Sequence, residues 1–147
     1  MLRDAHAGAI RPLPMLFRMA TELDEALAAT SLSEVERRVV ERLVGQLREE
    51  LGDELYAVWL YGSRARGEPP RPESDVDLLV ISRQDEHRHW RRVHEIAYKA
   101  AVAEGASPAW YSVHVDDLDW LRGRREIRSF FIQEVDRDKV VLYGSPE

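Results

Sequence analysis

Two aspartates, one residue apart, carry the clearest chemical signal in this sequence. Asp75 and Asp77 open an apolar run that ends at Ile81. Residues two apart in a β-strand point to the same face, roughly 6.6 Å apart along the strand, so the two carboxylates are expected to project together. Adjacent carboxylates repel each other unless a cation lies between them. Mg²⁺ is the natural candidate, because it takes hard oxygen ligands and shares them with substrate phosphates.

A Gly-Ser pair precedes these aspartates by one loop. Gly62 and Ser63 end an earlier apolar run, and the polar loop that follows contains prolines that cannot continue a strand or a helix. Such a turn can offer backbone N–H groups to phosphate oxygens. Two arginines, Arg64 and Arg66, flank the turn. The whole segment therefore predicts a site for a phosphorylated ligand together with a divalent cation.

Composition excludes several classes of function. The chain of 147 residues contains no cysteine, which excludes disulfides, zinc–thiolate sites and cysteine nucleophiles. Its net charge of -6 argues against direct binding of nucleic acid. No apolar run approaches the roughly 18 residues of a membrane span, and the N-terminus does not resemble a signal peptide. We therefore expect a cytoplasmic protein that makes no membrane contact.

Hydrophobic periodicity and turn residues predict the elements that must position this site. The expected helices cover residues 15–29, 33–51, 84–104 and 125–135, and a helical turn follows Asp116 or Asp117. The second helix opens with a capping box, Ser33-x-x-Glu36. The expected strands cover residues 55–61, 75–82, 110–115 and 140–143.

This order of elements predicts an α/β (mixed α+β) fold class. We expect a small mixed β-sheet of about four strands with helices on one face, so that the other face stays partly open and carries the aspartates. Residues 1–30 are interpreted as an N-terminal extension that contains a helix, and residues 31–147 as the domain that holds the site.

Residues 60–81 resemble the signature of the DNA polymerase β-like nucleotidyltransferase superfamily: an apolar residue, Gly-Ser, a loop, and Asp-x-Asp inside a strand. Within this segment, Gly-Ser-Arg-Ala-Arg-Gly at 62–67 and Ser-Asp-Val-Asp-Leu-Leu-Val at 74–80 are similar to the minimal nucleotidyltransferase (MNT) group. The resemblance covers about residues 33–144 and supports the polymerase β-like fold for them.

The resemblance implies transfer of a nucleotidyl group from a nucleoside triphosphate, with ATP as the expected donor. Asp75 and Asp77 would be catalytic metal ligands that hold two Mg²⁺ ions when ATP is bound, an arrangement suited to in-line displacement. Glycine allows the chain to approach phosphate closely, and arginine can offset the charge of the departing pyrophosphate. The implied nucleotide-binding residues are Gly62, Ser63, Arg64 and Arg66.

One feature of the family pattern is missing. Competent members typically carry a third carboxylate on a neighbouring strand, but the expected strand 110–115 places Trp110, Ser112 and His114 on the face of the aspartates. His114 is the candidate catalytic substitute, since a neutral imidazole can accept a proton or bind a metal. Asp116 has the right parity but lies at the strand end, where the expected role is a helix N-cap. Which of the two replaces the missing acid stays open.

The resemblance also implies a partner. Members of the MNT group pair with HEPN-type toxins, which are RNA-cleaving helical proteins, and silence them by transferring AMP to a tyrosine or by forming a complex. An acidic chain suits a more basic partner. The function that follows is an antitoxin-type protein adenylyltransferase. Two alternative functions stay open: a catalytically weakened module that acts by contact only, and an aminoglycoside-type nucleotidyltransferase. For the helix at 15–29, a contact with a second copy of the chain or with a partner stays open as well.

Overall fold

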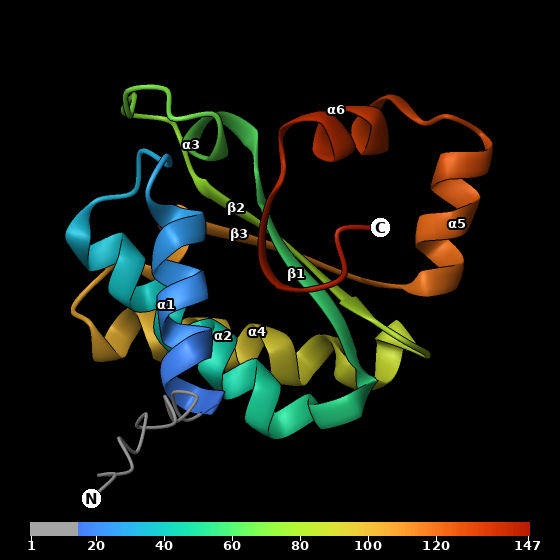
Figure 1. Ribbon diagram of the computed structural model, residues 1–147, viewed down its shortest axis with the longest axis horizontal. Helices are drawn as coiled ribbons and strands as arrows, with labels where there is room; N and C mark the ends of the chain where they lie inside the picture. Colours follow the sequence, from blue (N-terminus) through green and yellow to red (C-terminus); the bar gives the residue numbers. More distant parts are fainter. Residues whose placement is uncertain (1–14) are drawn as a thin grey trace, which may run out of the picture.

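The structure, a computed structural model, describes residues 15–147 (Figure 1). Helices and strands alternate along this part of the chain. The helices are α1 (Met15–Leu27), α2 (Glu34–Leu51), α3 (Gly62–Ala65), α4 (Glu86–Ala103), α5 (Leu118–Glu126) and α6 (Phe130–Asp138). The strands are β1 (Leu55–Tyr61), β2 (Val76–Ser82), β3 (Tyr111–Asp117) and β4 (Val140–Gly144), and two short 3-10 helices are η1 (Gly52–Glu54) and η2 (Pro108–Trp110).

The four strands form one mixed sheet in the order β3-β2-β1-β4. β1 pairs antiparallel with β2 and with β4, whereas β2 and β3 run parallel. The two central strands are β1 and β2, which flank the segment that carries the glycine turn. The predicted fold class, a mixed α/β domain with a four-stranded sheet, is confirmed.

Helices cover both faces of this sheet, although the sequence pattern placed them on one. α2 and α4 lie together on one side of the strands, and α5 and α6 lie toward the other (Figure 1). Two core clusters result. The first core cluster joins α2 and α4 to β-residues such as Val58, Leu60, Leu78 and Val80. The second core cluster joins α5 and α6 to Ala57, Trp59, Leu79 and Ile81.

The physical reason is the composition of the central strands. In β1 and β2 nearly every residue is buried, on both sides of the pleat. Strands that are apolar on both faces need cover on both faces. Asp77 interrupts this pattern in β2, because it is only partly buried between Val76 and Leu78. The face of the sheet that α5 and α6 cover is therefore only partly shielded at Asp77, and the candidate site lies at this end of β2.

The last helix begins later than its sequence pattern indicated, and the helix before it is longer. The helix expected from residue 125 is α6, which begins after Ser129, whose hydroxyl accepts the N–H of Ile132 at 3.3 Å. The preceding residue, Arg128, has a φ of 52°, a left-handed conformation that no continuing helix allows. The turn expected after residue 117 is a full helix, α5, which ends at Glu126.

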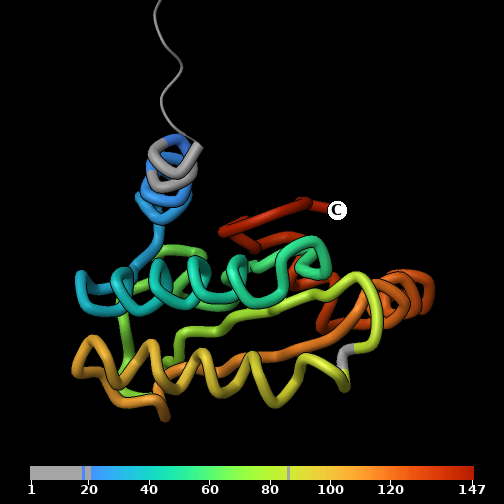
Figure 2. The backbone as a smooth tube through the Cα atoms, turned by 90° about the horizontal axis from the view of Figure 1, so that it is seen from below, coloured from blue at the N-terminus to red at the C-terminus, as the bar shows by residue number. Residues whose placement is uncertain are grey.

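The N-terminal segment packs on the domain through its last residues. α1 contacts β4, and the chain then continues into α2 (Figure 2). α2 begins with the predicted capping box: the Ser33 hydroxyl accepts the Glu36 N–H at 3.2 Å, and the Ser33 N–H donates to Glu36 Oε1 at 2.8 Å. Leu27 is fully buried in the first core cluster. The domain boundary at residue 30 stays a prediction. The exposed apolar side chains expected at 15–17 and 19, on which a contact with a partner or a second copy would depend, lie outside the side chains that the structure describes.

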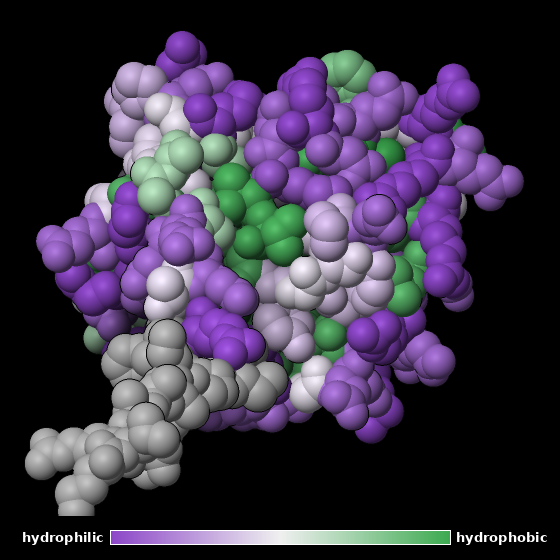
Figure 3. All heavy atoms as spheres, in the orientation of Figure 1, coloured by the Kyte–Doolittle hydropathy of each residue, from purple (hydrophilic) through white to green (hydrophobic). Residues whose placement is uncertain are grey.

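The outer strand β4 keeps part of its apolar surface. Val140 and Val141 are partly buried, and Figure 3 shows hydrophobic side chains at the surface near the middle of the molecule, where β1 and β4 lie. In the described part of the chain, no helix is long and apolar enough to cross a membrane.

Candidate active site

The glycine turn and the aspartate pair meet at one end of the two central strands. Tyr61, the last residue of β1, is the register partner of Asp77 in β2. The chain then turns at Gly62, whose φ is +76°. A Cβ built on Gly62 would lie 2.5 Å from Asp77 Oδ2, closer than real Cβ atoms approach oxygen. Only glycine fits here, because any side chain would displace the carboxylate.

Asp75 and Asp77 lie at the start of β2, which begins at Val76 and not at residue 75 as the pattern indicated. Val76 and Leu78 belong to the first core cluster, so Asp77 faces the opposite side of the sheet. Asp75 precedes the strand and is near enough for its charge to act on Asp77; the shared face of the two carboxylates stays a prediction. Burial and then the charge of Asp75 raise the pKa of Asp77 to about 6, while Arg66 acts in the opposite direction. A cation between the carboxylates would relieve this repulsion.

An aromatic wall stands beside the pair. The ring of Tyr61 meets that of Phe131 edge to face, with centroids 5.4 Å apart. Burial and the charge of Asp77 raise the pKa of Tyr61 to about 12, so its hydroxyl stays protonated at neutral pH. Phe131 also stacks on His114 at 5.6 Å, and Trp120 approaches the same imidazole at 5.0 Å. Phe131 of α6 thus forms part of the aromatic wall, whereas the sequence pattern predicted only that it lies on the apolar face of a helix.

His114 lies on the face of the aspartates, one step further along the sheet. In the parallel pairing of β2 and β3, Asp77 is opposite Ser112, and Leu79 is opposite His114. His114 Nε2 lies 2.7 Å from Asp116 Oδ2, so the carboxylate holds one nitrogen of the ring. The imidazole remains partly exposed, and Asp116 holds Nε2 and not Nδ1.

Asp116 does not cap the following helix, and that expectation is wrong. The N-cap of α5 is Asp117, whose Oδ1 accepts the N–H of Trp120 at 2.9 Å. The reason is strand parity: β3 continues to Asp117, so Asp116 still points to the face of His114, whereas Asp117 ends the strand. The position opposite Asp77 carries Ser112 and no acid. Among residues 15–147, no three His, Cys, Asp or Glu side chains group closely enough to hold a metal by themselves.

The two arginines of the turn separate. Arg64 is 4% exposed and turns toward α2, where its Nη2 donates to Ser31 O at 3.1 Å and pairs with Glu36. Arg66 stays at the surface, where it pairs with Glu68 at 2.9 Å and with Asp138 at 3.1 Å. Because its charge lowers the pKa of Asp77, Arg66 is the arginine that acts on the carboxylate pair. The nucleotide-binding roles of Ser63, Arg64 and Arg66 stay predictions.

Trp110 lies elsewhere than expected. It belongs to η2 and is half exposed, and it lines a pocket with Glu36 and Tyr111 instead of sharing a strand face with His114. The strand begins only at Tyr111, because Pro108 directs the preceding residues into a 3-10 turn.

A family model for the nucleotidyltransferase domain matches residues 40–119, which include Gly62, Ser63, Asp75 and Asp77. The chain therefore belongs to the nucleotidyltransferase domain family, as the resemblance of its motif predicted. A comparison with curated proteins gave no match.

Solved structures with a similar fold include toxin–antitoxin complexes. One, a toxin–antitoxin with AMP-PNP, is 25% identical with a TM-score of 0.45 and covers 72% of this chain and 73% of its own. Another, a mutant of the toxin–antitoxin MntA-HpeT, is 23% identical with a TM-score of 0.44 and the same coverage. At these TM-scores, the likeness supports no conclusion about the function of this chain.

Proposed function

We propose that this nucleotidyltransferase domain transfers AMP from ATP to a hydroxyl group of a protein, in a reaction that requires Mg²⁺. The observation that carries the proposal is the close approach of Gly62 and Asp77, since a Cβ on the glycine would lie 2.5 Å from the carboxylate. This contact brings a turn suited to phosphate and a carboxylate pair suited to a divalent cation to the same point.

The carboxylate pair fits a divalent cation. Asp75 and Asp77 offer hard oxygen ligands on one face, and burial and mutual repulsion raise the pKa of Asp77 despite the charge of Arg66. When bound there, Mg²⁺ would offset the charge of the triphosphate and of the transition state of an in-line displacement. The two-ion arrangement implied by the resemblance is part of this proposal.

The turn supplies the contacts to the triphosphate. The Ser63 hydroxyl and the free N–H groups at the start of α3 can donate to phosphate oxygens. Arg66 adds a positive charge at the surface beside the carboxylates. As the acceptor oxygen bonds to the α-phosphorus, the bond to the β-phosphate breaks, and pyrophosphate leaves with charge that Arg66 can offset.

The proton of the acceptor hydroxyl needs a base, and His114 is our candidate. Asp116 holds Nε2 at 2.7 Å, which fixes the ring and leaves Nδ1 to take the proton. The flanking rings of Trp120 and Phe131 contact the imidazole and help to fix its orientation. Asp116 is then a positioning residue, because it acts through His114.

We infer that the acceptor belongs to a partner protein, and a HEPN-type toxin is the candidate. The resemblance of the motif to the MNT group supports this partner. The net charge of -6 suits a basic protein surface. A contact between copies of the chain stays a further prediction.

A second candidate function is inhibition by contact alone. The observation that favours it is the serine at position 112, opposite Asp77, where a third acid would complete the metal site. In that case the domain binds Mg-ATP, or only its partner, and transfers nothing.

Transfer of label from α-labelled ATP to a co-purified HEPN-type toxin separates these candidates. We expect labelling that requires Mg²⁺ and is lost in Asp77→Asn. Asp119→Asn, a matched change on an exposed aspartate of α5, should leave labelling intact. Unlabelled toxin, together with full suppression of toxicity by Asp77→Asn, would refute transfer and leave inhibition by contact.

A further inference from the structure

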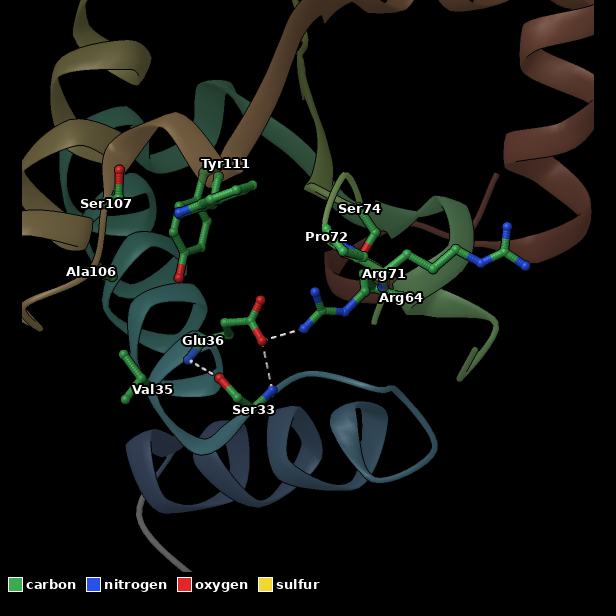
Figure 4. A pocket seen from close by; sticks show the side chains of 11 residues that line it. Ser33, Val35, Glu36, Arg64, Arg71, Pro72, Ser74, Ala106, Ser107 and Tyr111 are labelled. Carbon is green, nitrogen blue, oxygen red and sulfur yellow. Dashed lines mark hydrogen bonds and ion pairs between the residues drawn. The ribbon is translucent and has the colours of Figure 1, made fainter. Parts of the chain in front are cut away.

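A cavity of about 350 Å³ lies beside the site, on the α2 side of the sheet. It is an open pocket lined by the start of α2, the loop at 71–74 and the start of β3 (Figure 4). Two of its residues adjoin the catalytic motif directly, since Arg64 follows Ser63 and Ser74 precedes Asp75. Its volume lies in the range of about 300–1,000 Å³ that is usual for small-molecule sites.

Three polar atoms of this cavity have no partner within the described part of the chain. Arg64 Nε and the Tyr111 hydroxyl are buried and make no hydrogen bond there. Both bonds that Glu36 accepts, from the Ser33 N–H and from Arg64, go to Oε1, which leaves Oε2 without a donor. Buried polar groups are almost always paired, so the two buried donors, Arg64 Nε and the Tyr111 hydroxyl, call for a ligand or for water. Glu36 Oε2, on a side chain that is 18% exposed, offers an acceptor beside them.

The charges of Arg64 and Glu36, the two ionised residues beside the unpaired atoms, offset each other. Arg64 pairs with Glu36, and Figure 4 shows the Arg71 side chain pointing away from them. Burial and the charge of Glu36 raise the pKa of Tyr111 to about 12, so its hydroxyl is a donor at neutral pH. A neutral occupant therefore fits better than an anion or a cation.

The remaining walls suit a flat ring. Trp110 is half exposed and offers an indole surface for stacking. Val35, Pro72 and Ala106 add apolar surface around it. A neutral planar group that carries one N–H donor for Glu36 Oε2 and ring acceptors for Tyr111 and Arg64 would satisfy all three polar atoms.

We infer that this cavity binds a nucleobase with an exocyclic amino group, of which adenine is the example to test. Two sources share this chemistry: the base of the donor nucleotide and a separate nucleoside. The first source rests on the proposed function, because the donor must then reach from the cavity past Ser74 to Asp75. The second does not depend on transfer.

Titration calorimetry with adenosine, without Mg²⁺, tests the cavity independently of catalysis. We expect adenosine to bind and Trp110→Leu to weaken binding at least about tenfold, the size of one lost stacking contact. Trp90→Leu is the matched control, because Trp90 is 53% exposed on α4 against 50% for Trp110 and does not line the cavity. Asp77→Asn should leave adenosine binding unchanged.

The exocyclic amine has its own comparison. Purine riboside lacks this group and leaves Glu36 Oε2 unpaired, so it should bind about tenfold more weakly than adenosine. Tyr111→Phe keeps the ring and removes the hydroxyl, and should weaken adenosine binding several-fold. No adenosine binding at millimolar concentration, or equal binding by the Trp110→Leu and Trp90→Leu variants, would overturn the inference and assign the unpaired atoms to water.

Titration with Mg-ATP distinguishes the two sources. If the cavity holds the base of the donor, Trp110→Leu weakens Mg-ATP by the same factor as adenosine, and adenosine competes with Mg-ATP. If the cavity holds a separate nucleoside, Mg-ATP binds the Trp110→Leu and Trp90→Leu variants with equal affinity. If the proposed function is wrong but the cavity does bind a nucleobase, no label is transferred to the toxin, whereas adenosine still binds.

Discussion

At the scale of single residues, one close contact defines the site. Gly62 has a positive φ, and its missing side chain leaves room for Asp77 Oδ2. Most residues avoid this backbone conformation, and here the carboxylate excludes them sterically as well. A change at Gly62 therefore acts on the fold and on the position of the Asp77 carboxylate together.

Gly62→Ala should lower the free energy of unfolding by about 2 kcal/mol, because the new Cβ meets both penalties. Gly45→Ala is the matched control: Gly45 lies inside α2, where a Cβ would meet no packed neighbour within 4 Å, so alanine should stabilise the chain by about 0.5–1 kcal/mol. Urea denaturation of the two variants measures the contrast. Equal effects of the two changes would contradict the close contact.

Asp77→Asn should stabilise the metal-free protein at neutral pH. Because the pKa of Asp77 is raised to about 6 in the folded state, ionisation costs stability as pH rises from about 4 to about 6, and the full cost persists above that. Removing the charge should recover about 1–2 kcal/mol at pH 7 after allowance for solvent screening. The variant should bind Mg²⁺ poorly.

Thermal denaturation in EDTA at pH 4 and at pH 7.5 checks this prediction. The gain in melting temperature of Asp77→Asn over the parent chain should be larger at the higher pH. An equal gain in melting temperature at pH 4 and at pH 7.5 would mean that the surroundings of Asp77 do not raise its pKa.

At the scale of elements, the glycine turn is anchored to α2. Arg64 connects α3 to Glu36 and Ser31, and Gly67 packs so closely on Ala29 O that a Cβ would lie 2.8 Å from it. The turn that faces the carboxylates is therefore fixed from behind by the start of α2. The same contacts form one wall of the cavity described above.

Arg64→Ala should cost about 3 kcal/mol of unfolding free energy, because it leaves Glu36 without its buried partner. Arg92→Ala, which removes an exposed ion pair with Glu50, should barely change the urea midpoint. The comparison of the two midpoints tests whether the buried pair holds the turn. A small effect of Arg64→Ala would show that α3 is positioned by other contacts.

At the scale of the whole molecule, two core clusters lie on opposite faces of one sheet. The first is built by α2 and α4, and Leu27 from the end of α1 is fully buried in it. The second is built by α5 and α6, whose aromatic residues also border the site. The face that carries Asp77 is thus bordered by two helices that follow it in the sequence.

Leu27→Ala should cost about 3 kcal/mol, because it leaves a cavity in the first core cluster. Val102→Ala, at a position 52% exposed on α4, should have little effect. Chemical denaturation of both variants locates the start of the folding unit. A cost near zero for Leu27→Ala would support a domain boundary at residue 30.

The sequence by itself determined the family, the fold class and the position of the aspartate pair. These follow from local patterns: the spacing of Gly-Ser and Asp-x-Asp, the period of two in the strands, and the capping box at Ser33. Such patterns report how one segment meets its own neighbours, and they need no knowledge of distant contacts.

Only the tertiary structure decided which similar residues act at the site. It turned Arg64 into the interior and left Arg66 beside the carboxylates, and it gave the helix cap to Asp117, so that Asp116 pairs with His114. These choices depend on strand register and on long-range packing. The local alternation gives Asp116 the same parity as His114, but it does not say where β3 ends, and the structure extends the strand to Asp117, which then caps α5.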